Sequence, residues 1–269
     1  MTGIDGVGMC LASLLAEPFT PTGATVREAL DATAAAGFTE LSSWTWLLPF
    51  ATDAGTLDAA AADLAARGLR MRCAEGTMAW ATGGADDAAP ILEAAEVFGS
   101  DLVLAVCLEP TLAPGAQDRL GALAERVAAI GARVVVEFLP WTGLPTLGDA
   151  WELVEPLGDS VGLLIDTWHW QRQPGGGDLG LLASIPKTRI PFLQLSDALP
   201  APDGELMDET MNRRQLPGEG AIDYPPILTR VGTPFAAIEI FNPSIVRSLG
   251  VAKAALAMRD ATNAVLASA

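Results

Sequence analysis

Four polar residues in the second half of the chain each interrupt a run of apolar residues. They are Glu137 in VVVEF, Asp166 in LLIDTW, Gln194 in FLQLS and Glu239 in AIEIF. No Lys or Arg lies near enough in these runs to be an obvious partner. Because buried carboxylates that converge without a counter-charge are very unfavourable, the pattern predicts one divalent metal ion bound by these four side chains.

The types of ligand indicate which ion is bound. Carboxylate and amide oxygens favour a hard cation, so we expect Mn²⁺ or Mg²⁺ rather than Zn²⁺, which normally takes Cys or His ligands. His169 is the only histidine in the chain, and this excludes a His-rich zinc cluster. It follows Asp166 by three residues, so we expect it beside the metal, where it contacts substrate or moves a proton. A surface histidine is the alternative.

Two further residue types complete the predicted site. Trp168 flanks His169 in DTWHW and is expected to form an apolar wall against the substrate, with core packing as the alternative for Trp168 or Trp170. Arg213 and Arg214 precede PGEG in a long polar segment, residues 198–222. A cation there could hold a substrate oxygen or carboxylate, although adjacent arginines on a loop are also common at a surface.

These residues must be positioned by regular elements, and the chain alternates β-rich runs with Ala- and Leu-rich stretches of helical period. The runs recur at intervals of roughly 30 residues, the length of one βα unit, except before the last. We therefore predict an α/β protein, a single (β/α)₈ TIM barrel that occupies residues 1–269 as one domain. A long final helix is expected at about 244–266. The eight expected strands are 7–12, 38–44, 69–76, 101–108, 133–139, 161–168, 191–197 and 236–241.

Composition narrows the function further. The formal net charge of −17 argues against nucleic acid as a partner, and no stretch of about 20 residues is apolar and uncharged, so no membrane span is expected. The first 15 residues lack the features of a signal peptide, and Cys10, Cys73 and Cys107 form no CxxC motif. These observations lead us to expect a cytoplasmic protein with buried, reduced cysteines.

The segments EFLP, LLIDTWHW, IPKTRIPFLQLSDA, RRQLPGEG and IEIFNP together resemble the sugar isomerase/epimerase family of xylose-isomerase-like TIM barrels. The resemblance covers about residues 133–245. It implies that Glu137 and Glu239 also move the proton, and that His169 and Arg214 contact substrate. Gln194 stands where the ketose epimerases have a histidine. Metal-dependent 3-dehydroshikimate dehydratases are similar too and share a Gln ligand, but their strand-5 segment carries a further histidine that EFLPWTG lacks.

Two reactions therefore stay open. The first is isomerisation or epimerisation of a small sugar-like hydroxy-ketone, in which glutamates transfer a proton through an enediolate. The alternative is a lyase or dehydratase of the 3-dehydroshikimate dehydratase type, in which the same enolate expels a β-hydroxyl group. A merely structural barrel is the third hypothesis. The expected partner is a small polyhydroxylated substrate, and a homo-oligomer is left open.

Overall fold

The computed structural model describes residues 4–232 and 234–268 and has eight parallel strands in a closed barrel, each paired with its neighbours in sequence and β1 paired with β8. This confirms the predicted (β/α)₈ barrel. The outer residues of the predicted domain, 1–3 and 269, lie outside the described part of the chain. The strands are β1 (Val7–Cys10), β2 (Glu40–Trp44), β3 (Arg70–Thr77), β4 (Leu102–Val106), β5 (Arg133–Glu137), β6 (Val161–Asp166), β7 (Phe192–Leu195) and β8 (Phe235–Ile238).

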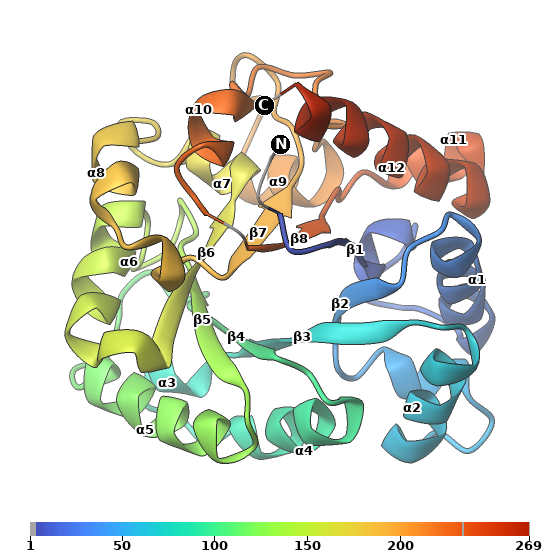
Figure 1. Cartoon of the computed structure of the whole chain (residues 1–269), viewed down its shortest axis with the longest axis horizontal. Coiled ribbons are helices and arrows are strands. Elements are labelled where there is room, and N and C mark those ends of the chain that lie inside the picture. Colours follow the sequence, from blue (N-terminus) through green and yellow to red (C-terminus); the bar gives the residue numbers. More distant parts are fainter. Residues whose placement is uncertain (1–3, 233, 269) are drawn as a thin grey trace.

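Helices surround the strands on the outside, and α12 lies beside α1 (Figure 1). Local signals start several of them: the Thr56 hydroxyl accepts from the Ala59 amide at the start of α2. The α-helices are α1 (Gly23–Ala35), α2 (Leu57–Ala66), α3 (Ala79–Thr82), α4 (Ala88–Phe98), α5 (Ala116–Ala129), α6 (Leu147–Val154), α7 (Thr167–Arg172), α8 (Leu179–Ser184), α9 (Leu206–Asn212), α10 (Tyr224–Leu228), α11 (Pro243–Leu249) and α12 (Val251–Ala267). The 3₁₀ helices are η1 (Leu11–Leu14), η2 (Leu48–Ala51), η3 (Glu155–Ser160) and η4 (Lys187–Arg189).

Two expected elements differ from the structure. The single final helix is divided into α11 and α12 at Gly250, whose φ of 78° lies in a region that favours glycine. The long polar segment after β7 is not all loop, because it contains α9. This second difference matters for the site, since α9 contributes Thr210 and leads directly into Arg214.

The alternation of side chains between the two faces of each strand determines where the candidate site lies. Alternate residues of neighbouring strands form a small apolar cluster inside the barrel, separate from the larger core between strands and helices. Val135, Leu164, Phe192 and Ala237 belong to the inner cluster. Since side chains alternate between the two faces of a strand, the residue two positions later points inward as well. Those residues are Glu137, Asp166, Gln194 and Glu239, directly above the apolar interior.

No helix in residues 4–232 or 234–268 is long and apolar enough to cross a membrane.

Candidate active site

The four predicted ligands lie at the C-terminal ends of four consecutive strands, where TIM barrels carry their active sites. Glu137 and Asp166 are the last residues of β5 and β6, Gln194 lies in β7, and Glu239 follows β8 directly. Asp166 and Gln194 are register partners. The amide of Glu239 donates to the carbonyl of Leu195 at 3.0 Å, which continues the pairing of β7 and β8 to this level.

Contacts link the predicted residues into one cluster. His169 Nε2 lies 3.4 Å from Glu137 Oε1 and 4.0 Å from Asp166 Oδ2. At the other end, Gln194 Nε2 donates to Glu239 Oε1 at 2.8 Å. His169 is 2% exposed, so the surface alternative for this histidine is wrong. Its place is fixed because Asp166 caps α7, with Oδ1 accepting from the amides of Trp168 at 2.7 Å and His169 at 3.0 Å.

Arg214 joins the two parts of this cluster, and it corrects the expectation that the carboxylates lack a basic partner. Its Nη1 donates to Asp166 Oδ2 at 2.6 Å and to Glu239 Oε2 at 3.1 Å. The carboxylates therefore have a counter-charge, which the sequence did not show because Arg214 comes from the segment after β7. Arg214 is 2% exposed, and the carbonyl and hydroxyl of Thr210 accept from its Nε at 3.0 and 3.2 Å. Arg213, by contrast, is paired near the surface with Asp203 and Asp208.

One guanidinium faces several buried carboxyl groups, and this shifts their pKa values in different directions. Burial would raise the pKa of Asp166, but the neighbouring Arg214 and His169 hold it below its usual value. Burial raises the pKa of Glu239 well above its usual value, and the nearby charges of Asp166, Glu137 and Glu75 add to this although Arg214 opposes it. One guanidinium therefore does not neutralise the whole group of carboxylates.

The cluster fits a divalent cation on two grounds. Gln194 Oε1 is buried and has no hydrogen-bond partner among the described residues, although such an atom normally has one. Oxygen and nitrogen atoms of Glu137, Asp166 and His169 also lie within 4.8 Å of one another, a grouping that could hold an ion. The three predicted carboxylates do not form one such group, since Glu239 belongs to a second group with Cys10 and Glu75.

A cavity of about 550 Å³ opens above the cluster. Glu137, Glu239, His169 and Arg214 line it, while Asp166 and Gln194 are completely buried beneath. The volume is within the usual range for small-molecule sites. The arrangement separates two tasks: the deeper pair can only support or hold an ion, whereas the two glutamates, His169 and Arg214 can touch a ligand.

Sequence reasoning missed two residues at this level of the barrel. Glu75, in β3, lines the cavity and is 3% exposed, and Cys10 at the end of β1 has its Sγ 3.5 Å from Glu239 Oε1. Burial raises the pKa of Glu75 to about 8. A signal for Glu75 was present, since it follows the inward-facing Cys73 by two residues. All three cysteines are free and buried, as expected.

Trp168 does not take its predicted place. It is completely buried and does not line the cavity. Its ring lies 5.6 Å from the Arg214 guanidinium carbon and 5.3 Å from the His169 ring, so it supports these two side chains from below. The aromatic wall next to His169 is Trp141, whose ring centroid is 5.4 Å away.

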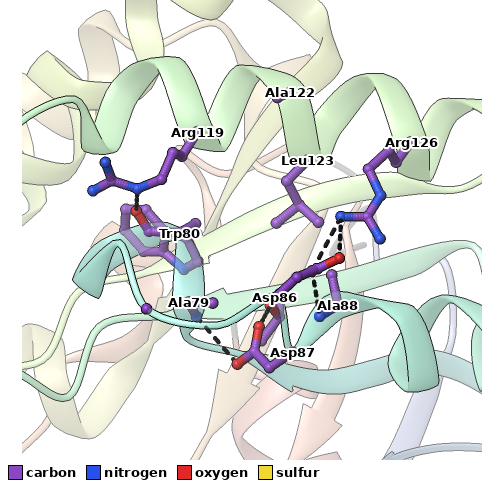
Figure 2. A pocket seen from close by; sticks show the side chains of 11 residues that line it. Ala79, Trp80, Asp86, Asp87, Ala88, Arg119, Ala122, Leu123 and Arg126 are labelled. Carbon is purple, nitrogen blue, oxygen red and sulfur yellow. Dashed lines mark hydrogen bonds and ion pairs between the residues drawn. The ribbon is translucent and has the colours of Figure 1, made fainter.

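A second hollow, of about 270 Å³, lies between the segment after β3 and α5 (Figure 2). Its charged groups already have partners: Arg126 pairs with Asp86, and Arg119 donates to three backbone carbonyls. Asp87 accepts from the amides of Met78 and Ala79. These contacts therefore hold the segment after β3 in place, and the polar group of the lining without a partner among the described residues is the Trp80 indole Nε1, which carries no acid–base chemistry.

Comparison with known proteins identifies structures of the same fold. Among solved structures, the chain resembles the IolI protein with a bound zinc atom, at 20% identity, 98% coverage of both chains and a TM-score of 0.81. It resembles D-allulose 3-epimerase from Methylomonas sp. at 15% identity, with 98% and 99% of the two chains covered and a TM-score of 0.69.

A third similar structure is the probable 3-DHS dehydratase AsbF from Bacillus anthracis, at 14% identity, with 96% and 97% covered and a TM-score of 0.70. These likenesses show the fold. The search among curated proteins found no match to this chain. A family model described as xylose isomerase-like TIM barrel matches residues 2–261. The chain therefore belongs to the xylose isomerase-like TIM barrel family, as the sequence motifs predicted.

Proposed function

We propose that the protein is a divalent-metal-dependent isomerase or epimerase that acts on a small hydroxy-ketone. The observation that carries the proposal is the cavity in which Glu137 and Glu239 meet His169 and Arg214 at the C-terminal end of the barrel. The family membership and the structural likeness to an epimerase support it.

Glu137, Asp166, Gln194 and Glu239 are the residues that would hold the ion. The unpartnered Gln194 Oε1 and the surplus of carboxylates are the features that support this set. We propose Mn²⁺ or Mg²⁺ because the four ligands are oxygen donors. When bound, such an ion would polarise a substrate carbonyl and stabilise negative charge on its oxygen.

The chain's own groups would carry the proton. One of the two glutamates that reach the cavity removes a proton from the carbon beside the carbonyl, which leaves an enediolate. The other returns a proton to the neighbouring carbon or to the opposite face of the same carbon. Arg214 and His169, which line the same cavity, would orient the substrate oxygens, and Arg214 would add positive charge where negative charge develops.

A dehydratase is the second candidate, favoured by Gln194 and by the likeness to AsbF. One experiment distinguishes the isomerase or epimerase from the dehydratase. The protein, loaded with Mn²⁺ or Mg²⁺, is incubated in D₂O with a panel of ketoses and with 3-dehydroshikimate, and NMR follows the carbon-bound hydrogens. An epimeric or isomeric product that carries deuterium supports the first candidate. Loss of water with a new double bond supports the second, and conversion of a panel member with neither deuterium uptake nor loss of water counts against both.

A further inference from the structure

The cavity above the carboxylates has two chemically different parts. Its charged and hydroxyl-bearing side chains are Glu75, Glu137, His169, Thr210, Arg214 and Glu239. The other lining residues are apolar or aromatic, and among them Trp141 has a buried indole Nε1 without a hydrogen-bond partner in the described part of the chain. The carboxylates at strand ends are almost fully buried, whereas Phe19 and Trp46, which lie on the loops above, are 65% and 43% exposed. The polar groups thus form the inner end of the cavity and aromatic residues lie toward its mouth.

Four of the aromatic residues, Phe19, Trp44, Trp46 and Phe241, are joined through Trp44, and we call them the aromatic row. The ring centroid of Trp44 lies 5.2 Å from that of Phe19, 5.9 Å from that of Trp46 and 6.1 Å from that of Phe241, and all three pairs are stacked. Phe241 in turn lies 5.3 Å from the guanidinium carbon of Arg214. The row therefore leads from solvent to the reacting end of the same cavity.

This row would be a poor partner for a ligand with hydroxyl groups along its whole length. Hydroxyls that enter a cavity must replace their hydrogen bonds to water, and unreplaced bonds cost binding energy. Thr210 carries the one uncharged hydroxyl in the lining, and it already contacts Arg214. An apolar or planar group would instead bury surface against exposed rings and gain aromatic stacking. Large exposed apolar residues gathered at one place also mark a binding surface.

We propose that the aromatic row of Phe19, Trp44, Trp46 and Phe241 is a binding subsite, and that the substrate is a hydroxy-ketone linked to an apolar or aromatic group. The hydroxy-ketone part rests on the proposed function and occupies the inner end beside Glu137 and Glu239. The attached group lies along the row. A free ketose fills only the polar part of the cavity.

Two synthetic compounds test this, 1,3-dihydroxypropan-2-one and its monophenyl ether, 1-hydroxy-3-phenoxypropan-2-one. They share the hydroxy-ketone and differ by the aromatic group. Calorimetric titration of the metal-loaded protein should show that the phenyl ether binds about tenfold more tightly or better. A Phe19→Ala, Trp46→Ala double variant should lose most of this preference. Phe50→Ala is the matched control, because Phe50 is 49% exposed and packs edge-on against Trp46 but does not line the cavity.

Phe19 and Trp46, the residues substituted in the double variant, are both exposed. Thermal unfolding of each variant shows whether the fold is intact. Equal affinity for the two compounds, or a preference that survives in the folded double variant, would overturn the subsite. Deuterium exchange into the compounds, measured in parallel, tests the proposed function by itself. Exchange without a phenyl preference rejects the subsite and keeps the function, whereas a row-dependent preference without exchange supports the subsite and counts against the function.

Discussion

Arg214 and Asp166 form a fully buried ion pair, with Nη1 2.6 Å from Oδ2, in the middle of the proposed metal site. In the metal-free protein this arginine is the counter-charge of the carboxylates. Arg214→Met should therefore destabilise the metal-free protein by about 3–5 kcal/mol, because it leaves buried carboxylates unpaired. Urea unfolding in the presence of a chelator measures this change.

The adjacent Arg213 is the matched control, since its ion pairs lie near the surface. Arg213→Met should change the free energy of unfolding by no more than about 1 kcal/mol. Added Mn²⁺ or Mg²⁺ should recover part of the stability lost in Arg214→Met. Equal losses for the two variants would show that Arg214 does not balance the buried charge.

Gln194 should bind the ion through its unpartnered Oε1. Gln194→Leu is expected to weaken metal affinity by at least about tenfold, and Gln194→His to retain binding with a shift toward borderline metals. Gln173→Leu removes a buried glutamine elsewhere, one that accepts from the Leu147 amide, and should leave metal affinity unchanged. Calorimetric metal titration compares the three, and unchanged affinity in Gln194→Leu would remove Gln194 from the ligand set.

His169 is predicted to contact substrate rather than the ion. His169→Asn should lower kcat/KM by about 100-fold and leave metal affinity nearly unchanged. The test separates a substrate contact from a metal ligand, since His169 Nε2 is also near the proposed ligands Glu137 and Asp166. A large fall in metal affinity would make His169 a ligand instead, and an unchanged kcat/KM would remove it from the site.

Glu75 gives the metal-free protein a specific pH dependence. Its pKa rises from a usual value near 4.5 to about 8. Between these two pH values the folded state therefore keeps a proton on Glu75 that the unfolded state has lost. The stability that this neutral carboxyl contributes is complete below about pH 4.5 and is lost as pH rises through 8. Glu75→Gln, which stays neutral, should thus match the wild type near pH 4.5 and exceed its stability by a few kcal/mol near pH 9.

Urea unfolding at several pH values with a chelator present measures this difference. Glu28→Gln, at an exposed position on α1, is the control and should follow the wild type throughout. A Glu75→Gln variant whose stability runs parallel to that of the wild type across the range would show that this carboxyl is ionised in the fold.

The sequence predicts the barrel and the level of the site because both depend on local patterns. Short apolar runs and the interval between them identify the strands, and Glu137, Asp166, Gln194 and Glu239 each interrupt such a run. The role of Arg214 as counter-charge was not predictable in the same way. It depends on how α9 folds the segment after β7 back over the strand ends, which no local pattern describes.

Trp168 and Trp141 illustrate a second limit. Both are aromatic residues next to a strand end, and the sequence favours the one beside His169. The structure turns Trp168 into the core beneath Arg214 and leaves Trp141 at the cavity. The choice depends on the first turn of α7, which starts directly at Asp166 and turns successive side chains to different sides.

The central claim is that Glu137 and Glu239 move a carbon-bound proton with the help of a divalent ion. The most direct measurement is solvent deuterium uptake at the carbon beside the carbonyl, followed by NMR with a substrate that the wild type converts. We expect uptake by the metal-loaded wild type, none after chelation, and at least about a 100-fold loss in Glu137→Gln and Glu239→Gln variants that still bind metal. Turnover of that substrate with no deuterium in substrate or product, or uptake that persists in both variants, would contradict it.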